Sequence, residues 1–174
     1  TSLSAVVMAG MLSAYLFLAK NLTRLNTTEQ FDRHSQRAVT LFSRDVSSAT
    51  KIVSFSSATV SGVTTATIVM NVPTGSVTYT WSGSTATPGS LMRAVTVTAT
   101  GVTTTESIVD QVSVAVFTCR DGNGNATTTT FNTRQIQLTL TGALRSTTGQ
   151  TETTLASRTA ASPNLLVAGQ ALIQ

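Results

Sequence analysis

Few side chains in this sequence could carry out chemistry, and those few stand apart from one another. His34 is the only histidine and Cys119 the only cysteine. No Gly-x-Ser-x-Gly stretch marks an activated serine, and one cysteine can form neither an intramolecular disulfide nor a thiolate zinc site. His34 stands among Arg33, Gln36 and Arg37, where we expect a solvated imidazole. The sequence therefore predicts no catalytic activity and no cofactor.

One stretch has the spacing of a calcium-binding loop. Asp121, Asn123 and Asn125 stand at the first three alternating ligand positions of an EF-hand. The twelfth position is Asn132, whose amide cannot supply the bidentate carboxylate that such a loop uses. The flanking residues alternate as strands do. We interpret residues 121–125 as a polar hairpin turn, and keep Asp121, Asn123 and Asn125 as a candidate metal site.

The composition is unusual for a soluble enzyme. The 174 residues are 41% apolar and only 10% charged, and about a fifth of them are Thr. Charged residues normally make up about a quarter of a soluble domain, so this chain needs another source of polarity or a non-aqueous neighbour. The net charge of +4 comes from Lys and Arg residues that are scattered singly. A nucleic-acid partner is therefore unsupported.

Residues 1–19 contain no charged side chain, and Lys20 carries the first charge. As a helix at about 1.5 Å per residue they would be about 28 Å long, close to the roughly 30 Å hydrocarbon core of a bilayer. We expect this segment to lie in a membrane or in the core of a filament. The large apolar side chains expected to make those contacts are Leu3, Val6, Val7, Met8, Met11, Leu12, Tyr15, Leu16, Phe17 and Leu18.

The helical pattern continues past Lys20 with no Pro or Gly up to Ser61. Apolar residues recur at spacings of three, four and seven, which indicates an amphipathic helix over residues 20–52. The alternative is a single-pass anchor followed by an unrelated helix. The side chains expected to pack on a folded domain are Leu22, Leu25, Phe31, Ala38, Phe42, Val46 and Ala49.

Residues 53–174 change to a period of two, which is typical of strands. Each strand then has one apolar and one hydroxyl-rich face, as in an antiparallel sheet with a solvated side. We predict an α+β fold, in which a long N-terminal helix (residues 1–52) packs its second half on an antiparallel, Thr-rich sheet (residues 53–174). The alternating runs are residues 77–81, 95–98, 112–116 and 135–140, and the turn signals are residues 73–75, 87–89, 121–125 and 141–142.

This layout resembles type IV pilins and the pseudopilins of type II secretion, in particular their minor members. Residues 44–49 (R-D-V-S-S-A) are similar to an Arg-Asp-hydrophobic stretch near the helix end of those proteins. Residues 112–117, 121–124 and 134–140 resemble their penultimate hairpin, and residues 155–164 their closing strand. The family's cleavage-site Gly-Phe and its Glu at the fifth mature position are missing, because the fifth residue here is Ala5. Either the sequence begins several residues inside the mature helix, which we expect, or it is a divergent member of the family.

The resemblance implies a structural subunit of a type IV pilus-like extracellular filament, a homo-oligomer that forms through residues 1–52. It also implies that the chain lies in the inner membrane until an ATP-driven assembly machinery extracts it. The alternatives are a pseudopilin of a type II secretion system and a membrane-anchored binding module that never polymerises. A surface or cargo ligand, adhesion and motility stay open.

The end of the sequence is also apolar. Residues 165–173 are uncharged and are too few to span a bilayer as a helix. We consider two interpretations: a last strand or tail on its own domain, or a segment that docks on a neighbouring subunit.

Overall fold

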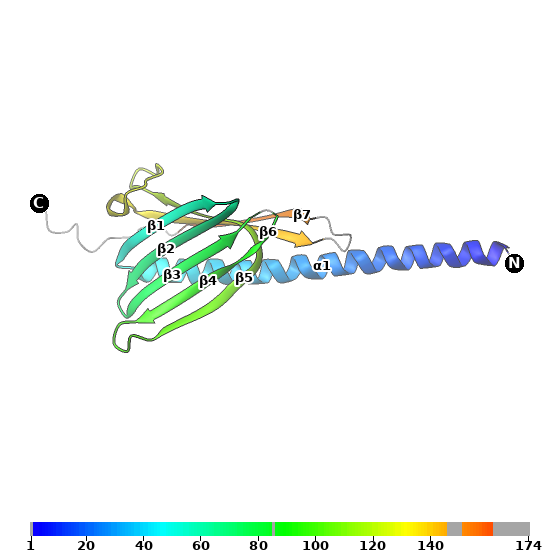
Figure 1. Cartoon of the computed structure of the whole chain (residues 1–174), viewed down its shortest axis with the longest axis horizontal. Coiled ribbons are helices and arrows are strands. Elements are labelled where there is room, and N and C mark those ends of the chain that lie inside the picture. Colours follow the sequence, from blue (N-terminus) through cyan, green and yellow to red (C-terminus); the bar gives the residue numbers. More distant parts are fainter. Residues whose placement is uncertain (1, 85, 146–150, 162–174) are drawn as a thin grey trace, which may run out of the picture.

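The computed structural model describes residues 2–84, 86–145 and 151–161. A single long helix, α1 (Ser2–Ser48), precedes the strands in the described part of the chain, and Figure 1 shows it extending far beyond the sheet. A short 3-10 helix, η1 (Thr130–Asn132), lies between the fifth and sixth strands. The strands are β1 (Lys51–Val60), β2 (Val63–Val72), β3 (Gly75–Gly83), β4 (Gly89–Val97), β5 (Thr103–Arg120), β6 (Gln135–Arg145) and β7 (Thr151–Ala161).

The described strands form one antiparallel sheet in chain order, from β1 to β7. Most connections are short: Ser61 and Gly62, with φ of 51° and 81°, make a two-residue turn between β1 and β2. The turn signals at residues 73–75 and 87–89 fall at the next two connections. The sheet is curled, because β5 also contacts β2 and β3. Across this curl, Trp81 Nε1 of β3 donates a hydrogen bond to the Val112 carbonyl oxygen of β5 at 3.1 Å.

Alternation places one side of most strands in the core. On β3 the side chains of Val77, Tyr79 and Trp81 are buried, and on β6 those of Ile136, Leu138 and Leu140. Apolar side chains at every second position share one face of a strand, so this side of the sheet is mainly apolar. Exposed threonine side chains also join neighbouring strands through hydroxyl–hydroxyl hydrogen bonds, among them Thr59 with Thr64 and Thr96 with Thr103, each at 2.8 Å.

Strand β5 departs from the expected alternation. The sequence pattern placed Val112, Val114 and Val116 on one apolar face, but Val116 is 44% exposed and Ser113 and Ala115 are buried. The register shifts between Val112 and Val114, where β5 leaves its pairing with β4 and continues along β6. A bulge puts two successive residues on the same side and reverses every later side chain. The expectation for residues 112–116 was therefore wrong beyond Val112.

The expected turn at residues 141–142 was also wrong. Thr141 and Gly142 lie inside β6, where its pairing with both neighbouring strands shifts register. A Cβ atom on Gly142 would come within 2.6 Å of the Phe31 ring. This glycine therefore lets the helix approach the sheet rather than reversing the chain.

The fold class expected from the sequence needs correction. It assigned the whole second half of the helix, residues 20–52, to packing on the sheet, yet Leu22 is 58% exposed, and the first buried side chain among those that the structure describes on the helix is Phe31. Residues 26–30 (N-T-T-E-Q) are polar and interrupt the apolar stripe of the helix, which explains why its packing on the sheet begins only at Phe31. The helix ends at Ser48 and β1 begins at Lys51, so the boundary expected between residues 52 and 53 lies inside β1. The curled seven-stranded sheet, rather than the helix, makes up most of the packed structure.

The charge-free residues 1–19 have the length of a membrane span. Within the residues whose side chains are described, however, no helix is both long and apolar enough to cross a membrane.

Candidate functional site

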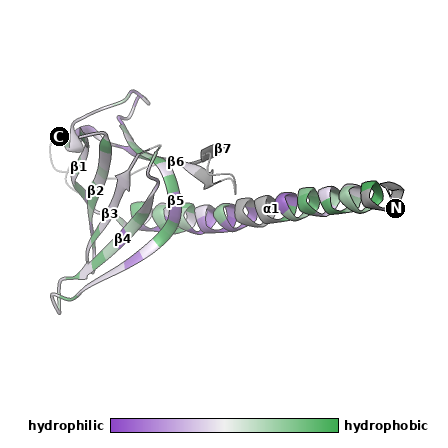
Figure 2. Cartoon of the chain, turned by 45° about the vertical axis from the view of Figure 1, so that its right-hand side comes forward, coloured by the Kyte–Doolittle hydropathy of each residue, from purple (hydrophilic) through white to green (hydrophobic). Residues whose placement is uncertain are grey.

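The part of α1 that projects from the sheet carries exposed apolar side chains. Met8, Phe17 and Val6 are 74%, 69% and 70% exposed. Figure 2 shows this end of α1 as largely hydrophobic and well separated from the strands. Nine side chains predicted to line the membrane or filament core are at least half exposed, and so is Leu22, which was predicted to pack on the sheet; the nine are Val6, Val7, Met8, Met11, Leu12, Tyr15, Leu16, Phe17 and Leu18. The side chains of Leu3 and Leu25 lie outside the described residues.

These side chains surround the helix rather than forming a stripe. Val6, Val7 and Met8 are consecutive, as are Tyr15 to Leu18, and successive helix residues are about 100° apart. A helix that is apolar on all sides is normally buried by other helices or by lipid. An exposed apolar surface of this extent is typical of an interaction site. We call residues 6–22 of α1 the apolar segment.

The remainder of α1 lies on the sheet. Phe31, Ala38, Phe42, Val46 and Ala49 are buried, so five of the seven predicted packing residues lie in the core. The Phe42 ring meets Tyr79 edge-on at 5.2 Å between centroids, and Phe117 at 6.0 Å. Aromatic pairs in this geometry add about 0.5–1.5 kcal/mol beyond their buried area. The packed end of α1 thus holds the apolar segment in a defined direction relative to the sheet.

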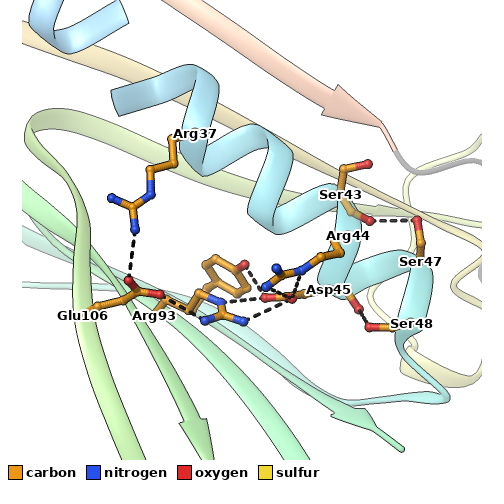
Figure 3. Close-up of polar contacts among 9 residues, drawn as sticks. Arg37, Ser43, Arg44, Asp45, Ser47, Ser48, Arg93 and Glu106 are labelled. Atoms are coloured by element: carbon orange, nitrogen blue, oxygen red, sulfur yellow. Dashed lines mark hydrogen bonds and ion pairs between the residues drawn. The ribbon is translucent and has the colours of Figure 1, made fainter. Parts of the chain in front are cut away.

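A buried ionic network fastens this end of the helix. The carboxylate of Asp45 on α1 accepts hydrogen bonds from Arg93 Nε at 2.6 Å, from Arg93 Nη2 at 3.1 Å and from the Tyr79 hydroxyl at 2.7 Å. Arg44 adds two longer hydrogen bonds to the same carboxylate, from Nη2 at 3.2 Å and from Nε at 3.4 Å. Figure 3 shows Arg44 and Arg93 directed toward Asp45. Every oxygen of the buried carboxylate is therefore hydrogen-bonded, as a buried charge requires.

The network extends to the surface through Glu106 of β5. Glu106 accepts a hydrogen bond from Arg93 Nη1 at 3.0 Å, and Arg37 of α1 approaches its other oxygen at 3.4 Å (Figure 3). The Arg93 side chain is 12% exposed, whereas that of Arg37 is 65% exposed. Arg93 is therefore shielded from solvent, whereas the exposed Arg37–Glu106 pair is screened by water and salt.

The network shifts the pKa values of its members. Burial by itself raises the pKa of Asp45, but the hydrogen bonds and charge of Arg93, with those of Tyr79 and Arg44, outweigh it and leave that pKa below its usual range. Burial and the neighbouring Asp45 carboxylate raise the pKa of Tyr79. The hydrogen bond to Asp45 raises the pKa of Arg93. All three groups therefore keep one protonation state near neutral pH, which suits a structural role.

Sequence reasoning missed this network as a functional unit. In the sequence, Asp45 stands out only as part of the pilin-like stretch at residues 44–49, and Arg93 is one of the singly scattered basic residues. One signal was present: Asp45 lies three residues after Phe42 and four before Ala49, and so falls on the buried stripe. An acidic residue on an apolar stripe needs a cationic partner.

The candidate calcium loop is a turn stabilised by its own carboxylate. Asp121 Oδ1 accepts hydrogen bonds from the backbone N–H groups of Asn123 and Asn125, both at 2.9 Å. Arg120 Nη1 also donates to the Gly124 carbonyl oxygen at 2.7 Å, which brings a positive charge to this loop. Among the described residues, no three His, Cys, Asp or Glu side chains lie close enough to hold a metal ion. The arrangement favours the polar-turn interpretation.

The remaining candidates for chemistry lie apart. His34 is exposed on α1, and Cys119 is buried on β5 with its pKa raised by burial to about 11. A protonated, buried thiol is a poor nucleophile. The predicted docking segment, residues 165–173, lies outside the described residues.

No protein-family model matches the sequence, and no curated protein matches it.

Proposed function

We propose that this protein is a structural subunit of a type IV pilus-like extracellular filament, which polymerises through the apolar segment of α1. The observation that carries the proposal is the exposure of ten large apolar side chains around a helix that projects from a packed domain. Such a surface is stable in water only when something covers it. Copies of the same helix supply a cover of matching length and polarity.

The energy available from such assembly is substantial. Full burial of one large apolar side chain contributes roughly 1.5–3 kcal/mol. Several such side chains per subunit would offset the loss of translational and rotational freedom on association. Gly10 has no atom within 4 Å of the place where a Cβ would stand, so a neighbouring helix could approach its backbone closely.

The proposal divides the chain into two parts with different tasks. The apolar segment forms the filament core, and the residues from Phe31 onward hold the sheet at a fixed place along the helix. The hydroxyl-rich side of the sheet then faces solvent and any surface or cargo ligand. Before assembly the chain would be held at the inner membrane and handed to an assembly machinery, as the resemblance to pilins implies.

Electron microscopy of material sheared from the cell surface tests the proposal. Long filaments that react with an antibody against this chain are the expected result. A chain that stays with the cell and forms no filament would overturn it, and would favour a short secretion pseudopilus or an anchored, non-polymerising module.

A matched pair of variants locates the contact. Leu12 is 61% exposed, so Leu12→Lys places a charge in the proposed core without touching the sheet. We expect this variant to fold but to form no filaments. Ala99→Lys adds the same charge in the exposed turn between β4 and β5 and should leave filaments intact. Filaments of normal yield from Leu12→Lys would contradict assembly through the apolar segment.

A further inference from the structure

Two adjoining cavities lie on the inner side of the curled sheet. Their volumes are about 340 and 220 Å³. Ser57 of β1 lines both of them, and the successive β5 residues Phe117 and Val116 line the larger and the smaller one. The larger cavity is also lined by Ala66 of β2 and the smaller one by Trp81 of β3, both of which are buried in the core. We call this site the paired cavities.

The loop between β5 and β6 borders the larger cavity. Thr128 of this loop lines it, η1 contacts β1, and Figure 1 shows the loop beside that strand. The loop is fixed to β5 near its start, where the Thr127 N–H donates to the Cys119 carbonyl oxygen at 2.9 Å. It is fixed again at its end, where the Arg134 N–H donates to the Arg120 carbonyl oxygen at 2.7 Å. Thr128 therefore has a defined place beside the cavity.

The lining of the paired cavities carries no charge. Among the lining residues in the described part of the chain, none has an ionisable side chain. A charged ligand would lose its hydration there and find no counter-charge, which costs free energy. The paired cavities therefore suit a neutral ligand.

The lining also offers hydrogen-bonding groups. Ser57 and Thr128 are exposed, and their hydroxyl groups have no hydrogen-bond partner within residues 2–84, 86–145 and 151–161. The Ser113 hydroxyl, which lines the smaller cavity, donates to the Thr141 carbonyl oxygen at 3.1 Å and keeps its own oxygen as an acceptor. A wholly apolar ligand would cover these hydroxyls without pairing them, at a cost in free energy.

Aromatic rings supply the apolar part of the lining. The half-buried Phe55 and Phe117 border the larger cavity, and Trp81 borders the smaller one. The Trp81 Nε1 group already donates to the Val112 carbonyl oxygen, so Trp81 offers ring surface rather than a donor. The face of an aromatic ring is electron-rich and attracts weakly positive C–H groups. The matching ligand has C–H faces as well as hydroxyl groups.

We propose that the paired cavities bind a neutral oligosaccharide through two adjacent sugar rings. A sugar ring carries C–H groups on its faces and hydroxyl groups at its edge, which is the combination that the lining matches. The larger cavity lies at the lower end of the roughly 300–1,000 Å³ range of small-molecule sites and the smaller one below it, so each suits a single ring. This binding goes beyond filament assembly, because the site belongs to the sheet and not to the apolar segment.

An array of immobilised neutral and acidic oligosaccharides tests the proposal. The tagged full-length chain is applied in a zwitterionic detergent, because detergents with sugar headgroups would compete. We expect binding to at least one neutral oligosaccharide and none to those that carry a uronate or a sialate. The best neutral ligand is then titrated by saturation-transfer difference NMR. Its methyl monoglycoside, which has about half the contact atoms, should bind at least about tenfold more weakly.

Matched variants locate the site. Phe55→Ala removes a lining ring, whereas Phe131→Ala removes a 60% exposed ring on η1 that lines neither cavity. We expect Phe55→Ala to weaken binding at least about tenfold and Phe131→Ala to leave it unchanged. Ser57→Tyr fills space at the junction of the two cavities, and Ser54→Tyr places the same ring on the opposite face of β1. Ser57→Tyr alone should abolish binding, while Trp81 fluorescence without ligand stays native in every variant.

Several outcomes would overturn the proposal. They are binding to no neutral oligosaccharide, binding to acidic ones alone, and unchanged affinity in both Phe55→Ala and Ser57→Tyr. Because the full-length chain is used, cavities filled by the chain's own residues would also give no binding. If Phe55→Ala fails to fold, the two tyrosine variants decide the question. Repeating the titration with Leu12→Lys separates this proposal from filament formation, since loss of helix assembly should leave sugar binding unchanged.

Discussion

Asp45 of α1 and Arg93 of β4 form a doubly hydrogen-bonded ion pair inside the protein, with Nε–Oδ2 and Nη2–Oδ1 distances of 2.6 and 3.1 Å. The two residues are 48 positions apart, so the pair exists only after the helix has docked. Their side chains are 6% and 12% exposed. The pair therefore joins the helix that carries the apolar segment to the sheet at a single orientation.

Breaking this pair should weaken the docking of α1. Asp45→Asn removes the buried carboxylate that pairs with Arg93 and leaves Glu106 as its remaining counter-charge, so we expect a loss of about 1.5–3 kcal/mol of unfolding free energy. Urea unfolding in mild detergent, followed by Trp81 fluorescence, measures the change. Glu29→Gln is the control on the same helix, because the Glu29–Arg33 pair is exposed and should add nothing measurable. Equal stability of Asp45→Asn and the parent would contradict a role in docking.

The same pair should give the fold a specific acid dependence. The folded-state pKa of Asp45 lies below its usual value of about 3.9, so its contribution is complete above that pH. That contribution is lost as the pH falls through the lowered pKa, because protonation then favours the unfolded chain. Unfolding free energy measured from pH 5 down to pH 2 should fall less steeply for Asp45→Asn than for the parent. Asp110, whose pKa is also lowered, contributes to both slopes. Identical slopes would show that Asp45 gives no such linkage.

The contact between Phe31 and Gly142 should tolerate no added methyl group. Gly142→Ala places a Cβ within 2.6 Å of the Phe31 ring, which must then move. Overpacking of this kind costs about 1–3 kcal/mol. Phe31→Leu combined with Gly142→Ala should recover part of that loss, as unfolding curves would reveal. Gly122→Ala is the control, since its Cβ would meet only Arg134 Cγ at 3.7 Å. A neutral Gly142→Ala would mean that the ring has room to shift.

Cys119 should react slowly in the folded protein. With a pKa near 11, only about a thousandth of this thiol is ionised at pH 8, and its side chain is buried. Labelling with Ellman's reagent should be at least about 100-fold slower than for the same chain in concentrated urea. Comparable rates in the two states would place the thiol at the surface.

Much of the architecture can be read from local patterns. The charge-free start of the helix, the spacing of Phe31, Ala38 and Phe42 and the alternation along β6 each reflect one side chain in one repeating geometry. Such features depend on neighbours in sequence, so their periodicity survives in the primary structure. The apolar segment, which carries the proposed function, belongs to this class.

The features that were misjudged depend on contacts between distant residues. The bulge in β5 reverses the sides of Val114 and Ala115 because β5 must leave β4 and follow β6. Gly142 looks like a turn residue in the sequence, and only its contact with the distant Phe31 ring shows why a glycine is needed there. The late start of helix packing also depends on where the sheet lies beneath α1.

The amino-acid sequence alone determined that this chain begins with a charge-free helix, because residues 1–19 hold no charge and the helical period continues beyond them. Only the tertiary structure decided which polar groups could be buried. Asp45, Arg93, Tyr79 and Glu106 come from four separate elements, and a charge can leave water only where its partners converge in space. That convergence has no period along the chain, and for this reason local patterns do not contain it.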